Sequence, residues 1–293
     1  MRGQFRMSRR RVRAASAGTA GRVRLITASA FWRTAWSVAV AFLAGMPTLA
    51  GGEASANACA DGRLRVAIDI GHSEEEPGAV SATGRREFRF NERFAQELVA
   101  KSQQRGTTGL WLDLFIHNSR AKSAELAARP RNAERMGGEV FVSIHHDSVQ
   151  KKHLVAKAVH GRRHLQAPEI RGYSIFVARR NPPFRDSEEL ATQIGRSFRL
   201  VGMVPTRHHA ENIPGERREE LDREAGVYEA PFTVLTSAAV PAVLIEIGVI
   251  ANAPEERDLE TTEYRAMAQL AILNALEAFC ASSNRAAGDV RSR

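Results

Sequence analysis

Short apolar segments alternate with amphipathic segments along most of this chain. The segments with the character of strands are 63–70, 110–116, 140–148, 172–179 and 241–250. Apolar residues recur at helical spacing in 91–106, 123–138, 187–202 and 264–279. Pro130 should break or kink the second of these helices, because proline lacks the backbone donor that a helix interior needs. Ser187 is the candidate N-cap of the third.

The order of these segments predicts an α/β fold, a mostly parallel sheet covered by helices on both faces. Several of the strands are apolar throughout, as expected when helices bury both faces of a sheet. We expect one domain over 59–281. Two charged segments, 150–171 and 208–230, do not fit the alternation and are expected to be surface insertions, the second of them rich in loops. The tail, 282–293, is predicted to be disordered.

Positive charge is concentrated near the N-terminus. The chain has 293 residues and a net charge of +9, and residues 1–58 hold nine arginines and one acidic residue, Glu53. The remainder therefore has 33 of the 42 basic residues and 32 of the 33 acidic ones. Because a nearly neutral body lacks the electrostatic footprint of a nucleic-acid binder, we predict no nucleic-acid partner.

Residues 1–58 have the layout of a signal peptide and its cleavage region. Arginines run to Arg33, an apolar stretch follows at 35–50, and small residues follow at 51–60. The apolar run is short for a membrane span and has Pro47 near its end. We predict export to the periplasm or cell wall, with membrane contact only through export. The alternative is an uncleaved membrane anchor.

The two cysteines of the chain, Cys59 and Cys280, bracket the predicted domain. An oxidising compartment would allow them to pair. Two free thiols, or loss of Cys59 by cleavage just beyond it, remain the alternatives.

Chemically active side chains occur where the predicted strands end or inside the last of them. In chain order these are His72, His145, His146, Asp147 and Glu246. Sites in open α/β sheets form outside the carboxyl ends of the strands. Two histidines and a glutamate as ligands, with a further glutamate as base, would match a zinc hydrolase that keeps one position open for water. No HExxH or CxxC motif is present, so the zinc site is a hypothesis from separate segments.

Several of these residues have a structural alternative. His72 follows a glycine and could be a turn residue. Since neighbouring side chains on a strand point to opposite faces, His145 and His146 should not bind the same metal. Spacing does not choose a ligand among the glutamates around the start of the first helix, which are Glu74, Glu75, Glu76, Glu87 and Glu92. The remaining histidines are expected to be solvated loop residues, including His153, His160, His164, His208 and His209.

Four blocks of the chain together resemble the zinc-dependent N-acetylmuramoyl-L-alanine amidases of bacterial cell walls. They are VAIDIGHSEEEPGAV, TGRREFRFNERFAQEL, FVSIHHDS and DREAGVYEAPFTVLTSAAVPAVLIEIGVIANAPEE, and the resemblance covers roughly 64–279. It implies a zinc-exopeptidase-like single domain, with Zn²⁺ held by His72, Glu87 and His145. It also implies that Glu246 is the catalytic base and that Asp147 orients an imidazole.

The same resemblance implies a peptidoglycan substrate, cleaved at the amide between N-acetylmuramic acid and L-alanine. Because no separate wall-binding domain is visible in the sequence, we also expect a protein activator or a localising partner. Two features depart from the family: the loop after His72 reads SEEEPG, and His146 stands where a small residue is usual. The rival functions are a zinc exopeptidase on ordinary peptides, with Arg179 or Arg223 binding a free terminus, and an inactive cell-wall-binding module.

Overall fold

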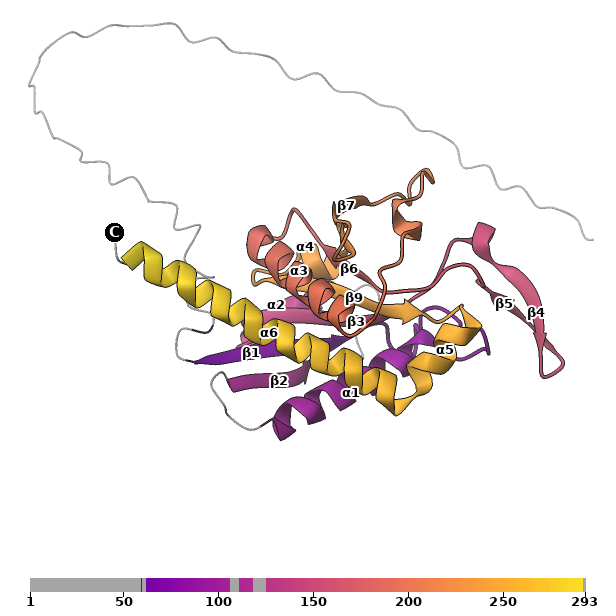
Figure 1. The fold of residues 1–293 in the computed structure, drawn as a ribbon, viewed down its shortest axis with the longest axis horizontal. Coiled ribbons are helices and arrows are strands. Elements are labelled where there is room, and N and C mark those ends of the chain that lie inside the picture. Colours follow the sequence, from indigo (N-terminus) through magenta and orange to yellow (C-terminus); the bar gives the residue numbers. More distant parts are fainter. Residues whose placement is uncertain (1–58, 60–61, 106–110, 118–124, 292–293) are drawn as a thin grey trace, which may run out of the picture. The chain divides into compact units, whose positions relative to one another are not determined.

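The computed structural model describes residues 59, 62–105, 111–117 and 125–291 (Figure 1). All of them belong to one compact unit, Leu49–Arg293. The predicted signal peptide, 1–58, lies outside the described residues and stays a prediction.

A seven-stranded mixed sheet forms the centre of this unit (Figure 1). Its strands are β1 (Arg63–Ile70), β2 (Trp111–His117), β3 (Val140–Asp147), β6 (Ser174–Val177), β7 (Glu219–Asp222), β8 (Val227–Glu229) and β9 (Ala242–Val249). They lie in the order β2-β1-β3-β9-β6-β8-β7. Four of the six pairings are parallel, and those of β6 with β9 and β7 with β8 are antiparallel. The predicted fold class is confirmed.

Helices cover both faces of the sheet. On one face, α1 (Glu87–Gln104), α3 (Phe184–Leu200) and α6 (Thr262–Arg291) pack over a large apolar core. On the other, α2 (Ala128–Arg135) and α4 (Thr233–Thr236) enclose a smaller core that contains Phe141 and Phe176. A further helix, α5 (Ala253–Glu260), joins β9 to α6. Because both faces are buried, β1, β3 and β9 are apolar over most of their length.

Three helix starts differ from the sequence prediction. Helix α1 begins at Glu87, four residues earlier than 91. Pro130 does not break a helix, because α2 begins at Ala128 and Pro130 lies in its first turn. Backbone N–H groups in the first turn have no partner within the helix, so the missing N–H of proline costs no hydrogen bond there. Ser187 is not an N-cap either, since α3 begins at Phe184. Its hydroxyl instead donates to Asn181 and lies 2.9 Å from the backbone nitrogen of Ala242.

The two charged segments behave differently. Residues 150–171 contain a short 3-10 helix, η2 (Lys151–His153), and an exposed hairpin of β4 (Val155–Val159) and β5 (Arg162–Gln166). The prediction that 208–230 is only a loop-rich surface insertion is wrong. This segment supplies a short 3-10 helix, η3 (His208–Ala210), and the sheet strands β7 and β8. These strands are only four and three residues long, too short to interrupt the charged pattern of the sequence.

The tail predicted to be disordered continues as helix. Helix α6 runs to Arg291, and the hydroxyls of Ser282 and Ser283 both donate to the carbonyl of Phe279. Within α6, Thr262–Ser283 is long and apolar enough to cross a membrane by length and composition, with a mean hydropathy of 1.2. Half of that window is buried inside the protein, as in a core helix.

Cys59 and Cys280 form a disulfide, with Cα atoms 5.5 Å apart and a sequence separation of 221 residues. It joins the chain before β1 to the core-facing side of α6, and both cysteines are buried. Of the alternatives open from the sequence, the paired state is the one observed.

We expect Cys280→Ser to lower the free energy of unfolding by about 2–5 kcal/mol, because the disulfide closes a very long loop in the unfolded chain. Urea denaturation of a chain that retains Cys59 measures the change. Dithiothreitol should destabilise the wild type to the level of the variant and leave the variant unchanged. Equal stability of oxidised wild type and variant would contradict this role.

Candidate metal centre and active site

Three neighbouring strands bring the candidate residues together at one edge of the sheet. His72 lies two residues after the end of β1, and His145 lies near the end of β3. Glu246 in β9 is the register partner of His145. Since β1, β3 and β9 are parallel, their carboxyl ends meet at this edge. Glu87 reaches the same place as the first residue of α1.

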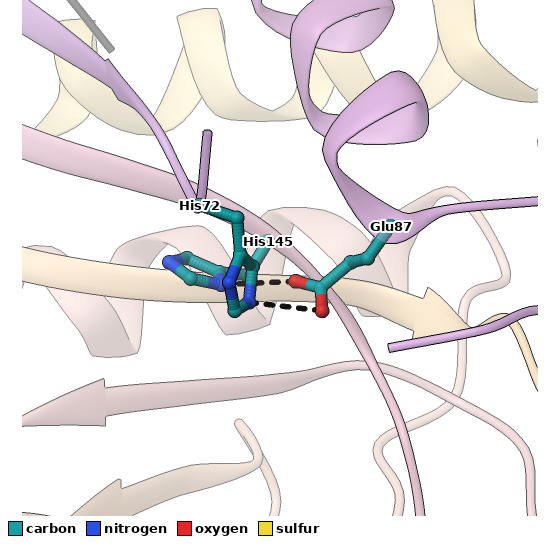
Figure 2. A group of neighbouring side chains, drawn as sticks. All are labelled: His72, Glu87 and His145. Carbon is teal, nitrogen blue, oxygen red and sulfur yellow. Dashed lines mark hydrogen bonds and ion pairs between the residues drawn. The ribbon is translucent and has the colours of Figure 1, made fainter. Parts of the chain in front are cut away.

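The structure brings His72, Glu87 and His145 into direct contact (Figure 2). Nε2 of His72 lies 3.0 Å from Oε2 of Glu87, and Nδ1 of His145 lies 3.0 Å from Oε1. The candidate ligand atoms of the three residues all lie within 4.8 Å of one another. Two imidazole nitrogens and a carboxylate that converge in this way could hold a metal ion.

Glu87 is the buried member of this group and is held in its ionised form. Burial would raise the pKa of Glu87, but hydrogen bonds to His145 and His72 outweigh it and hold the pKa well below the usual range. The carboxylate also accepts hydrogen bonds from the backbone of Ala79 and from the side chain of Asn91. The group therefore presents a negative charge between two imidazoles, which suits a cation.

The competing glutamates do not join the group. Glu74, Glu75 and Glu76 lie exposed in the loop after His72. Glu92 is partly exposed on α1, where it pairs with Arg89. The choice of Glu87 follows from its position at the start of α1, which directs its side chain towards the ends of β1 and β3.

Two glycines make room for the imidazoles. A Cβ added at Gly71 would lie 2.4 Å from Nε2 of His145. At Gly78, which has a φ of +72°, it would lie 2.5 Å from Oε2 of Glu87 and 2.6 Å from Cδ2 of His72. Glycine is therefore required for the backbone to approach the three side chains this closely.

Arg129 holds the backbone around His72 in place through hydrogen bonds. His72 has a φ of +66°, an unfavourable conformation for a residue with a side chain. The buried guanidinium of Arg129 donates to the carbonyl of His72 at 2.7 Å and to that of Ile70 at 3.1 Å. It also pairs with buried Asp69, which accepts a second hydrogen bond from Ser143.

We expect Arg129→Met to lower the free energy of unfolding by about 3–5 kcal/mol, because it leaves Asp69 buried without its charge partner. The matched control is Arg131→Met, which removes an exposed arginine from the same helix and should change stability by less than about 0.5 kcal/mol. Urea denaturation of both variants measures the difference. Similar losses in the two would show that the buried pair contributes little.

Glu246 lies beside the group, at the wall of a cavity of about 430 Å³ that His72 and His145 also line. Burial raises the pKa of Glu246 well above its ordinary value, and the carboxylates of Asp147 and Glu87 raise it further. Its Oε2 atom is buried and has no hydrogen-bond partner among the described residues. The apolar part of the cavity wall is formed by Leu126, Pro231, Phe232, Val234 and Leu244.

Comparison with known proteins shows the family of the chain. The profile of the N-acetylmuramoyl-L-alanine amidase family matches residues 66–278, which is well over half of the chain. The chain belongs to this family. N-acetylmuramoyl-L-alanine amidase AmiC of Neisseria meningitidis is 22% identical over 241 residues, which are 74% of this chain and 53% of that protein. The chain thus spans about half the length of the curated amidases it matches.

Solved amidase structures have the same fold. The N-acetylmuramoyl-L-alanine amidase from Clostridium difficile 630 superposes with a TM-score of 0.56 at 21% identity, over 75% of this chain and 98% of that one. The amidase Ami1 from Mycobacterium smegmatis gives a TM-score of 0.57 at 17% identity, over 75% and 97%.

His146 faces away from the group of His72, Glu87 and His145 in this amidase-family chain. Its ring is buried against α1, with centroids 5.6 Å from Phe90 and 6.1 Å from Phe94. Its Nδ1 lies 2.7 Å from Oδ1 of Asn91, whose amide group donates to Glu87. Burial lowers the pKa of His146 to about 3, so the ring is neutral. The opposite orientations of His145 and His146 agree with the strand geometry, and aromatic side chains of α1 pack against the imidazole of His146.

Asp147 contacts two histidines whose environment differs from the prediction. His208 and His209 are not solvated loop residues: the side chain of His208 is 0% exposed and that of His209 is 15% exposed. Oδ2 of Asp147 lies 2.8 Å from Nε2 of His209 and 3.4 Å from Nε2 of His208. Asp147 therefore orients an imidazole, as expected, but one outside the group of His72, Glu87 and His145. The only sequence signal for these residues was a second histidine pair in a charged segment.

Proposed function

We propose that this chain is a zinc-dependent amidase that hydrolyses the amide between N-acetylmuramic acid and L-alanine in peptidoglycan. The observation that carries the proposal is the convergence of His72, Glu87 and His145 beside Glu246 in one cavity. Membership of the amidase family supports both the reaction and the substrate class.

Zinc is the metal that the donor set fits best. Two imidazoles and one carboxylate are a common set of protein ligands for catalytic zinc, which keeps a further position for water or substrate. Bound there, zinc would supply a Lewis acid that lowers the pKa of water and polarises the carbonyl. The partly exposed His72 and His145 and the adjoining cavity leave this side of the group accessible.

Glu246 would move the protons. With its raised pKa and an oxygen free of hydrogen bonds, it can accept a proton from the attacking water and then deliver it to the leaving amine of L-alanine. A glutamate with an ordinary pKa would be a poorer proton donor to the amine, because general acid–base catalysis is most efficient when the pKa lies near the working pH. The apolar wall beside Glu246 would limit the access of bulk water to the reacting bond.

Export is part of the same proposal. Peptidoglycan lies outside the cytoplasm, and the arginine-rich and apolar pattern of residues 1–58 provides a route there. The disulfide between Cys59 and Cys280 is of the kind that persists in an oxidising compartment. A protein activator or localising partner remains part of the proposal.

The rival functions differ in their products. Purified sacculi and unlinked dipeptides should be incubated with the zinc-loaded protein and the products analysed by mass spectrometry. We expect free stem peptides that begin with L-alanine from sacculi and little cleavage of dipeptides. Efficient cleavage of dipeptides alone would support an exopeptidase, and binding of sacculi without any release would support an inactive module.

The two arginines considered as charge partners for a free peptide terminus lie away from the cavity that contains Glu246. Arg179 is paired with Glu219 at the surface. Arg223 is exposed on the loop between β7 and β8. Neither arginine lines the cavity that contains Glu246. The positions of Arg179 and Arg223 therefore give no support to the exopeptidase.

A further inference from the structure

A second group of metal-binding side chains lies outside the proposed catalytic centre. It consists of Asp147 at the end of β3 and of His208 and His209 in η3. One ligand atom from each residue lies within 4.8 Å of the others. Sixty residues of sequence separate the aspartate from the histidine pair, so tertiary structure alone brings them together.

The His208 ring presents a nitrogen that the protein leaves without a hydrogen bond. Its Nδ1 lies 2.8 Å from the hydroxyl oxygen of Thr206, and both residues are buried. Its Nε2 is buried and has no hydrogen-bond partner in the described part of the chain, although Oδ2 of Asp147 is only 3.4 Å away. A buried polar atom without a partner is costly and uncommon.

A cation between Nε2 of His208 and the carboxylate of Asp147 would satisfy both groups. If Nδ1 of His208 donates to Thr206, a neutral ring directs the lone pair of Nε2 towards the carboxylate of Asp147, which repels it. A metal ion between the two would accept both the lone pair and the carboxylate oxygen. We propose that Asp147, His208 and His209 form a second binding site for a divalent transition metal such as Zn²⁺.

The surroundings hold these ligands in place. The His209 ring packs edge-on against Phe176, with centroids 4.9 Å apart, and lies 5.6 Å from Tyr228. The Tyr228 hydroxyl donates to the backbone carbonyl of Thr206, which anchors the segment that carries the histidines. Partners that orient an imidazole through its second nitrogen, as Thr206 does for His208, are typical of metal sites. The partial exposure of His209 leaves a side from which water could complete the coordination.

The site would be structural in character and separate from the proposed catalytic metal. It would link η3, which precedes the short strand β8 and the edge strand β7, to the end of β3. One strand end serves both groups, because His145 and Asp147 lie two residues apart in β3, and the register shift beside them places an extra residue in β9. The inference does not depend on the amidase reaction, since it concerns metal binding alone.

The test is the number of zinc ions bound per chain, measured by atomic spectrometry after equilibrium dialysis against buffered Zn²⁺. We expect two ions for the wild type, one for His145→Ala and one for His209→Gln. The isosteric variant Asp147→Asn should weaken the second ion at least tenfold in competition with a chelator. His160→Gln, which removes an exposed histidine at the tip of the β4–β5 hairpin, should keep both ions.

Folding is checked in the same experiment by circular dichroism, and a melting curve provides an independent readout. In the His145→Ala background, added Zn²⁺ should raise the melting temperature of the chain, and Asp147→Asn should abolish that rise. A wild type that binds one ion, or a folded His209→Gln variant that binds two with unchanged affinity, would overturn the second site. Loss of amidase activity with two ions still bound would count against the proposed function and not against this inference.

Discussion

Glu246→Gln should reduce turnover on peptidoglycan by about 10²–10⁴-fold and leave the bound metal in place. The amide side chain keeps the size and position of Glu246 but cannot accept the proton of the attacking water. Among the described residues, Glu246 interacts with Glu87 only through the charge repulsion that raises the pKa of Glu246. The group of His72, Glu87 and His145 should therefore remain intact. Release of stem peptide from sacculi and zinc content, measured on the same sample, check the two parts.

The variant should also be as stable as the wild type, or more so near neutral pH. Burial of Glu246 opposes its ionisation, and glutamine removes that cost. A Glu246→Gln enzyme that released stem peptide at the normal rate would refute the role of general base. A variant that lost its zinc would show instead that Glu246 supports the metal.

The strands could be predicted from the sequence because they are buried on both faces. Continuous apolar runs of this kind have few alternatives, and β1, β3 and β9 lie within two residues of their predicted bounds. The rule that sites form at the carboxyl ends of parallel strands then placed His72 and His145 near each other. The same rule drew attention to Glu246 as a carboxylate inside an apolar strand.

Glu87 could not be chosen by that reasoning. It lies at the start of α1, where Arg86 occupies the N-cap and makes no side-chain cap, so no local signal marks the helix end. Five glutamates within twenty residues fit the pattern equally well. Resemblance to the amidases was needed to select one, and the contacts with His72 and His145 give the physical basis for it.

Arg129 and the histidines of η3 were missed for a related reason. Arg129 stands in the sequence ARPRNAER, where nothing local distinguishes it from Arg131. Its importance comes from the buried Asp69 and the strained His72, which belong to another part of the chain. The positions of His208 and His209 likewise depend on contacts with Asp147, which is distant in sequence. A charged segment is a reliable sign of solvent exposure only when no buried partner from a distant part of the chain contacts its side chains.

Glu87→Gln should remove the proposed catalytic metal and activity together, in contrast to Glu246→Gln. Neutralising the carboxylate leaves two imidazoles to hold a dication without an anionic ligand. We expect the affinity for zinc at this site to fall by more than the roughly 10–100-fold that loss of an outer-shell partner costs. Chelator competition measures the affinity, and release of stem peptide from sacculi measures the activity.

Glu92→Gln is the matched control, because it removes a carboxylate from the exposed side of the same helix. It should bind zinc and cleave sacculi as the wild type does. High zinc concentrations should restore part of the activity of Glu87→Gln but none of that of Glu246→Gln, since only the former fails through metal affinity. Two isosteric substitutions in one cavity thus separate the residue that holds the metal from the residue that moves the proton. Equal rescue of both by zinc would mean that this division of roles is wrong.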